Sequence, residues 1–350
     1  MKKILNGILL AVLLIIFLYS CSNISTAPSI IPPDPIGTTK PSIATYSEGE
    51  IYGSIDLNPS LLPIAVSEYV KFRISLPDIS EISAANLRVF EDNKEQGVML
   101  YKESSIAKKI DIAVILDVTG SMENAINGLK NSIIDFANTL SESGMDVRIA
   151  IIPFGDYVNP PSDTIPELDP PYLNLTTPAN AKEYVEYKLD ASGGGDGPEN
   201  PYDAIYVAAK ELTWRSDAQK FMILITDAPA HYPDDYSDYA HYSKNDLKPL
   251  LKGYFTLHSV IVPSWWYSPD TSDFSSPDDV RELSTTTGGL ILYTDNSGNV
   301  DLTALGIIEY IESSWIVAFE SNSSAEEHTI EAFFEKGEIK RYLKLENVEY

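Results

Sequence analysis

The chain has 350 residues, and its length together with a hydrophobic content of 44% suits two domains with sizeable cores. It carries 25 Lys and Arg against 51 Asp and Glu, which gives a formal net charge of −26. A surface this acidic repels nucleic acid and anionic lipid head groups, so we expect no nucleic-acid partner. The acidity alone does not establish metal binding.

The first 21 residues have the pattern of an export signal. Lys2 and Lys3 precede an apolar core, 8–19, that is too short to span a bilayer comfortably. Cys21, the only cysteine, follows directly, and the segment resembles a bacterial lipoprotein signal in which this cysteine is lipidated. A plain signal peptide or an uncleaved anchor is the alternative. We therefore expect a protein of the bacterial cell envelope that faces the periplasm or the cell surface, touches the membrane only through its lipid and has no disulfide.

Four regions follow the signal segment. Residues 22–46 are rich in Pro, Ser and Thr and predict an extended tether. Residues 47–106 have strand patterning, residues 107–313 alternate strands with helices, and residues 314–350 return to strands. Because each strand-patterned piece is too small to be stable alone, we expect the two to pair as one β-sandwich-like domain, with 107–313 inserted between them.

The central region predicts an α/β fold with a doubly wound, mostly parallel six-stranded sheet. The predicted strands are 112–116, 147–152, 172–175, 221–226, 257–262 and 290–293. Apolar residues at three- and four-residue spacing predict a helix over 126–140 that Gly144 ends. Further helices are expected over 179–189, after the cap Asn200 with Pro201 at the first position, and near 301–312.

Polar residues follow directly after the first of these predicted strands. Asp117, Thr119 and Ser121 alternate in a tight turn, where open α/β sheets hold their ligands. One carboxylate and two hydroxyl groups form half of an all-oxygen cage for a hard cation such as Mg²⁺. Two other interpretations stay open: Asp117 and Asp227 as simple helix caps, or a metal-dependent hydrolase.

Several motifs match one family in the right order. The region 107–313 resembles a von Willebrand factor A domain, and most closely the I-like domain of integrin β subunits. The segments that carry the resemblance are Asp117–Ser121, Phe154–Asn159, Leu175–Thr177, Asp196–Glu199, Asp203–Ile205, Trp214–Ala218 and Thr226–Ala228.

The resemblance implies a metal-ion-dependent adhesion site that binds Mg²⁺ or Mn²⁺, with a carboxylate of a partner protein completing the coordination. Carried over by position, its residues are Asp117, Thr119, Ser121, Glu199 and Asp227.

The resemblance also implies a possible flanking Ca²⁺ site with Asn159, Asp196, the Pro198 carbonyl and Glu199. Asn159 and Gly194 depart from the family pattern there, which removes charge and a ligand. A third site of the family is not expected, because Asn124 and Ala125 replace its carboxylates.

Other polar and aromatic residues are candidates for contact with a ligand. They are Asp156 and Asp163 in the loop that sets ligand choice in integrin β subunits, and Trp265 and Trp266 after the strand 257–262, which are recognition anchors or internal packing. The acidic stretch from His231 to His241 is interpreted as a solvated loop; a metal cluster is the alternative, although the histidine spacing matches no common zinc site.

These features together predict a metal-dependent protein-binding or adhesion module whose partner exposes an Asp or Glu carboxylate. The alternative is a structural envelope-assembly module in which the metal only stabilises the fold. The sequence lacks a Gly-x-Ser-x-Gly elbow and a phosphate-binding loop, so we expect no enzymatic activity.

Overall fold

The computed structural model describes residues 31–48, 51–58, 69–79, 81–158, 171–268, 274–275, 277 and 279–350. Cys21 and the predicted signal segment lie outside the described residues, as do Asn159 and Asp163. Within the described ranges, no helix is long and apolar enough to cross a membrane.

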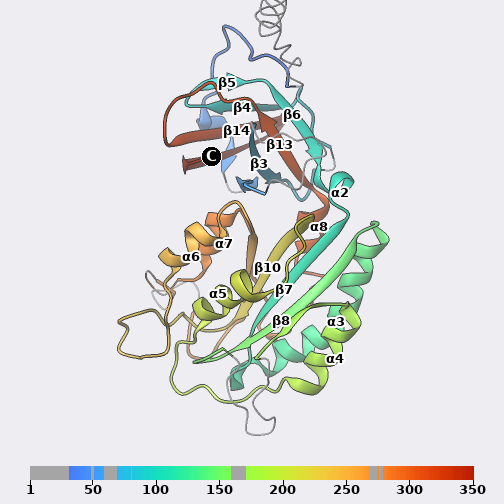
Figure 1. Cartoon of the computed structure of the whole chain (residues 1–350), viewed down its shortest axis with the longest axis vertical. Helices are drawn as coiled ribbons and strands as arrows, with labels where there is room; N and C mark the ends of the chain where they lie inside the picture. Colours follow the sequence, from blue (N-terminus) through green and yellow to red (C-terminus); the bar gives the residue numbers. More distant parts are fainter. Residues whose placement is uncertain are drawn as a thin grey trace, which may run out of the picture. The chain divides into compact units, whose positions relative to one another are not determined.

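The central region folds around a six-stranded sheet with the strand order β12-β11-β10-β7-β8-β9 (Figure 1). All neighbouring strands are parallel except the edge pair β8 and β9. The strands are β7 (Lys109–Asp117), β8 (Asp146–Phe154), β9 (Leu173–Thr176), β10 (Ala218–Thr226), β11 (Thr256–Ile261) and β12 (Ile291–Tyr293). The predicted mostly parallel six-stranded sheet is confirmed.

Helices cover both faces of this sheet (Figure 1). One face packs against α3 (Glu123–Glu142), α4 (Pro178–Lys188) and α8 (Ile307–Glu312). The other packs against α5 (Pro201–Glu211), α6 (Lys244–Leu251) and α7 (Arg281–Thr287). Because successive side chains of a strand point to opposite faces, Val114 of β7 joins the first core and Ile115 the second.

Local sequence signals set the ends of two helices that matter for the site. The Asn200 side chain accepts a hydrogen bond from the Asp203 backbone N–H at 3.2 Å, and Pro201 occupies the first turn of α5, as the sequence predicts. Gly144, with a φ of 84°, follows α3 in the left-handed conformation that ends many helices.

Two mostly antiparallel sheets are built from strands on both sides of the central region in the sequence. They have the orders β1-β15-β14-β4-β5 and β2-β3-β13-β6. Of the tail strands, β13 pairs with β3 and β6, β14 pairs with β4, and β15 pairs with β1. Both sheets contribute to one apolar core that includes Phe72, Val89 and Phe334.

The bounds of these strands and of the short helices are as follows. The strands are β1 (Ser47–Glu48), β2 (Tyr52–Ile55), β3 (Val70–Ser75), β4 (Leu87–Glu91), β5 (Lys94–Gln96), β6 (Val98–Lys102), β13 (Ser314–Phe319), β14 (His328–Lys336) and β15 (Ile339–Val348); the short helices are η1 (Ile43–Thr45), α2 (Glu103–Ile106) and η2 (Gly120–Met122).

The chain just before the first strand lies against the five-stranded sheet. Lys40 pairs with Glu331 at 2.6 Å, and Lys94 pairs with Asp34 at 2.7 Å. Tyr46 packs edge-on against Phe333, with ring centroids 5.2 Å apart.

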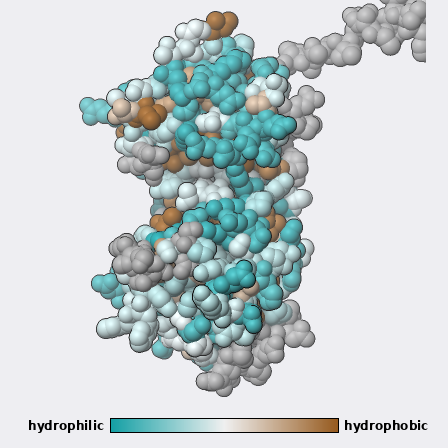
Figure 2. Space-filling view, turned by 90° about the vertical axis from the view of Figure 1, so that its left-hand side faces the viewer, coloured by the Kyte–Doolittle hydropathy of each residue, from teal (hydrophilic) through white to brown (hydrophobic). Residues whose placement is uncertain are grey.

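On the side that Figure 2 shows, the surface is mostly hydrophilic, with hydrophobic residues in small separate patches, as the acidic composition leads one to expect.

A buried ion pair lies where the smaller sheets meet the central region. Arg73 of β3 contacts Glu103 of α2 through two hydrogen bonds of 2.8 Å, and both side chains are almost inaccessible to water. The same guanidinium donates to the Thr256 hydroxyl at the start of β11, at 3.3 Å. Nearby, the Ser75 hydroxyl donates to the Tyr310 carbonyl of α8 at 2.9 Å.

We expect the substitution Arg73→Met to lower the free energy of unfolding by about 3–5 kcal/mol, because it leaves the Glu103 carboxylate buried without its cation. Lys109→Met is the control, since it removes an exposed pair with Asp217 and should change the free energy of unfolding far less. Urea denaturation measures both. Equal effects of the two substitutions would show that the buried pair does not hold the junction.

Candidate metal centre

Three carboxylates meet at one end of the central sheet. Asp117 is the last residue of β7, Asp227 directly follows β10, and Glu199 lies two residues before α5. The backbone N–H of Glu199 donates to the Pro229 carbonyl at 3.0 Å, which fixes Glu199 beside the continuation of β10. The structure therefore brings together carboxylates that are 28 to 110 positions apart in the sequence.

Glu199 and Asp227 line a cavity of about 400 Å³, and Asp117 lies buried behind them. Its lining includes Thr119, Ser121, Glu199 and Asp227, residues of the loop 193–197, and Trp266 and Tyr267. Among the described residues that line this cavity, none is Lys or Arg. The charge of the carboxylates thus has no cationic side chain beside it in the cavity wall.

Hydroxyl groups orient the carboxylates. Asp117 Oδ1 accepts hydrogen bonds from the Thr119 backbone N–H at 3.0 Å and from the Thr119 hydroxyl at 2.7 Å. Asp117 Oδ2 accepts from the Thr226 hydroxyl at 2.7 Å. The hydroxyls of Ser121 and Ser264 donate to Asp227. All five residues of the predicted adhesion site are therefore in the same end of the fold.

Burial and mutual repulsion disfavour negative charge at this site. Burial and the nearby Asp227 raise the pKa of Asp117 to about 7. Burial, with further contributions from Asp117 and three other acidic groups, raises the pKa of Glu199 to about 10, and burial also raises the pKa of Asp227.

One buried oxygen in the site lacks a partner among the described residues. Glu199 is 3% exposed, and its Oε2 has no hydrogen bond. A buried carboxylate oxygen without a partner costs free energy, and a divalent cation satisfies such an oxygen. The donor set, three carboxylates and two hydroxyls, contains only the hard oxygen ligands that Mg²⁺ and Mn²⁺ take. The residues present therefore fit the cation that the sequence implies.

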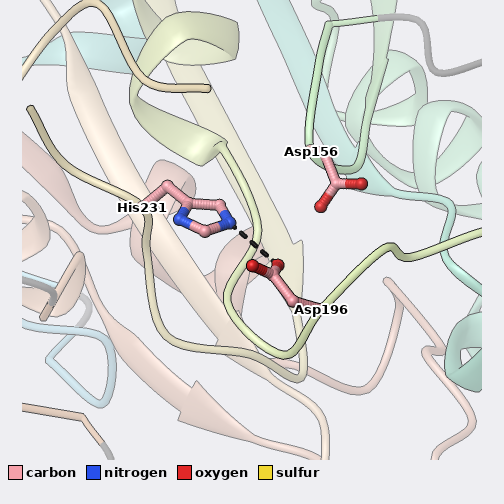
Figure 3. Close-up of side chains that lie close together, drawn as sticks. All are labelled: Asp156, Asp196 and His231. Atoms are coloured by element: carbon pink, nitrogen blue, oxygen red, sulfur yellow. Dashed lines mark hydrogen bonds and ion pairs between the residues drawn. The ribbon is translucent and has the colours of Figure 1, made fainter. Parts of the chain in front are cut away.

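A second cluster of possible ligands, drawn in Figure 3, includes Asp196, which also lines the cavity of this centre. Asp156 follows β8, Asp196 belongs to the loop before α5, and His231 follows β10; each offers one ligand atom, and these atoms all lie within 4.8 Å of one another. The sequence nominated Asp196 for a flanking site, but together with Asn159, the Pro198 carbonyl and Glu199. Asn159 is outside the described residues, so that ligand set stays a prediction.

The prediction of a solvated loop is wrong for His231, which is 2% exposed. Its ring nitrogens contact Asp235 at 2.6 Å and Asp196 at 3.1 Å, and these bonds hold it inside the loop. Asp156 was nominated as a ligand contact; its Oδ2 accepts from the Gly195 N–H at 3.0 Å. The sequence pointed to His231 only through the alternative of a metal cluster in the stretch from His231 to His241.

Two aromatic residues near the centre face solvent. Trp265 and Trp266 are 102% and 84% exposed, so they do not serve internal packing, and Trp266 lines the cavity. They remain candidates for contact with a ligand. Asp163, the other nominated contact, lies outside the described residues.

Comparison with known proteins supports the same kind of domain. The chain is similar in part to integrin β subunits. It is 27% identical to human integrin beta-4 over 174 residues, which are 45% of this chain and 10% of the integrin, and 24% identical to mouse integrin beta-6 over 183 residues, 45% of this chain and 23% of the integrin. It is also 26% identical to the alpha-protein kinase vwkA of Dictyostelium discoideum over 154 residues, 42% of this chain and 23% of the kinase.

No family model matches the chain. The region that this chain matches is at most about a quarter of the length of these relatives. The similarity indicates a von Willebrand factor A-like domain and is consistent with a metal-dependent adhesion module. The activities of the whole relatives do not transfer with it.

We expect Asp117→Asn to stabilise the metal-free protein at neutral pH, because it removes a buried charge and keeps the shape of the side chain. The folded pKa of about 7 is above the ordinary value of 3.8, so the wild-type protein loses stability as the pH rises from about 4 to 7. The variant does not have this loss. Its advantage should approach zero at pH 4 and reach about 1–3 kcal/mol at pH 7.5.

Urea denaturation in the presence of a chelator measures this difference. Asp217→Asn is the matched control, since it removes the same charge from an exposed position at the opposite end of β10. A variant that is less stable than the wild-type protein at pH 7.5 without metal would contradict the account of the buried charges.

Proposed function

We propose that the protein is a metal-dependent protein-binding module in which Asp117, Thr119, Ser121, Glu199 and Asp227 hold Mg²⁺ or Mn²⁺. A carboxylate of an Asp or Glu on a partner protein completes the coordination of the ion. The observation that carries this proposal is the buried Glu199 oxygen without a partner, at a cavity that three carboxylates line without a basic residue among its described lining.

The openness of the site to solvent supports a binding role. A cavity of about 400 Å³ leaves room for part of a partner beside the ion, and magnesium sites in proteins usually keep water that a ligand can displace. The exposed Trp266 offers apolar area in the cavity wall, of the kind that anchors many protein interfaces, and its neighbour Trp265 is exposed as well.

We further propose the setting that the sequence predicts: a bacterial envelope protein, anchored by a lipid on Cys21, that binds no nucleic acid and catalyses no reaction. In support of the last point, the three carboxylates and two hydroxyls of the site are used as cation ligands in this proposal, and Thr226 and Ser264 hold two of the carboxylates through hydrogen bonds. The second candidate is an assembly module in which the ion only relieves the buried charge and stabilises the fold.

Binding of the ion should raise the midpoint of thermal unfolding. At a hundredfold excess over the dissociation constant, Mg²⁺ or Mn²⁺ adds about 2.7 kcal/mol to the stability of the full chain, or roughly 5–10 °C. The shift should disappear in Asp117→Asn and persist in Asp217→Asn. A wild-type protein that unfolds at the same temperature with Mg²⁺ and with chelator would overturn the metal centre.

Selection from random displayed peptides separates the two candidate functions. The full chain is immobilised with Mg²⁺, and bound peptides are released with chelator. We expect the released peptides to be enriched in Asp or Glu and not to bind Asp117→Asn. Should the metal stabilise the protein while no peptide is retained, or should peptides stay bound in chelator, the assembly module would replace the adhesion module.

A further inference from the structure

We propose that Asp156, Asp196 and His231 form a second cation site, and that it takes a first-row transition-metal ion such as Zn²⁺ or Co²⁺ in preference to Ca²⁺. This site differs in its donors from the calcium site that the family resemblance implies, because an imidazole nitrogen takes part. It is independent of the magnesium centre in its ligands, although it lies next to it.

The geometry of the three side chains suits a single small ion (Figure 3). Ligand atoms about 2.1 Å from one ion lie about 3.0 Å apart when they are adjacent in an octahedron and about 4.2 Å apart when they are opposite. His231 Nε2 and Asp196 Oδ1 are 3.1 Å apart, as adjacent ligands are, and all three ligand atoms lie within 4.8 Å of one another, so a small side-chain movement suffices to bring all three onto one ion. The three residues come from three separate segments of the chain, which converge on this point.

The hydrogen bonds of His231 orient it as a metal ligand. Its Nδ1 lies 2.6 Å from Asp235 Oδ2, and the backbone N–H of Tyr232 and the Ser237 hydroxyl donate to the same carboxylate at 3.1 and 2.7 Å. A neutral ring that donates Nδ1–H to Asp235 turns the lone pair of Nε2 toward Asp196. A lone pair and a carboxylate repel each other unless a cation lies between them. At many metal sites a histidine donates one ring N–H to a carboxylate, as His231 does to Asp235, and binds the metal through its other ring nitrogen.

An unsatisfied oxygen within the cluster is a second sign of a missing cation. Asp156 Oδ1 is buried and has no hydrogen-bond partner among the described residues. Glu199 is next to this cluster as well as to the magnesium centre, because the charges of Asp156 and Asp196 both act on its carboxyl group.

The imidazole decides which class of ion the site takes. Ca²⁺ and Mg²⁺ prefer oxygen ligands, whereas Zn²⁺ and Co²⁺ bind imidazole nitrogen strongly. The competing explanation is a protonated His231 that pairs with Asp196 and Asp235 without any metal. The two explanations differ in the state of Nε2, which either bears a proton or binds an ion.

Titration of the chelator-treated full chain with Co²⁺ tests the proposal. Excess Mg²⁺ is present throughout to fill the hard-ligand centre, and the visible absorption of protein-bound Co²⁺ is recorded. We expect one Co²⁺ per chain, displaced by Zn²⁺ and not by Ca²⁺. His231→Gln should weaken binding at least tenfold, and Asp235→Asn about tenfold through the lost orientation of the ring.

His241→Gln is the matched control, because His241 is exposed and pairs with Asp203 away from the cluster. Its Co²⁺ affinity should equal that of the wild-type protein. If His231→Gln fails to fold, Asp156→Asn replaces it, since its side-chain oxygen can still accept from the Gly195 N–H.

Three results would overturn the site. They are a wild-type protein without Co²⁺ absorption, equal Co²⁺ binding by wild-type protein and the folded His231 or Asp156 variant, and histidine nitrogen NMR that shows His231 protonated on both nitrogens with Zn²⁺ present. Asp117→Asn should keep its Co²⁺ site. Loss of the Mg²⁺ effect and loss of the Co²⁺ site are therefore distinguishable failures.

Discussion

The repulsion among buried carboxylates at one end of the central sheet is the constraint on which the functional part of this protein depends. Asp117 and Glu199 are both nearly inaccessible to water, and burial and neighbouring charge raise the pKa of each. Such an arrangement destabilises the fold unless a cation or protons compensate for it. It persists because the surrounding sheet is rigid: β7 is fully buried from Ile110 to Asp117 and packs against a helical core on each face. The stability of the scaffold thus holds a site that would not form by itself.

The sheet also explains why these particular residues meet. Parallel strands place their carboxyl ends along one edge, so the residues at the ends of β7 and β10 become neighbours. Glu199 is held at the same edge by other contacts. The backbone bridge to the segment after β10 and the Asn200 cap of α5 fix it, and the glycines at 193 and 194 adopt positive φ angles just before it.

The sequence was sufficient for features that depend on local pattern. The apolar run 112–116, the helix after it, and the Asn200–Pro201 start of α5 each have a short-range cause, and each occurs where it was predicted. The strands of the tail were also recognisable, but alternation along one strand does not reveal its neighbours. That β13 lies between β3 and β6 is decided by packing between segments more than 200 residues apart.

The cluster of Asp156, Asp196 and His231 could not be found in this way. His231 lies among polar residues, which predict exposure, yet it is buried, with Asp235 and Ser237 at its Nδ1 and Asp196 at its Nε2. Asp156 was chosen for its place in a loop, and only the folded chain shows that it faces the other two. A site composed of single residues from three loops leaves no spacing pattern in the sequence.

The two proposed ions are linked through charge, although their ligands differ. Five carboxylates act on one another in this region, and the charges of Asp117, Asp156, Asp196 and Asp227 all bear on Glu199. One divalent ion leaves three net negative charges among them, whereas two leave one. The carboxylate of a partner would therefore meet weaker repulsion at the magnesium centre once the second site is filled, although water and salt in the open cavity reduce the effect. It follows that the transition-metal site would regulate the affinity for the partner without contacting it, by a coupling that is reciprocal between the two ligands.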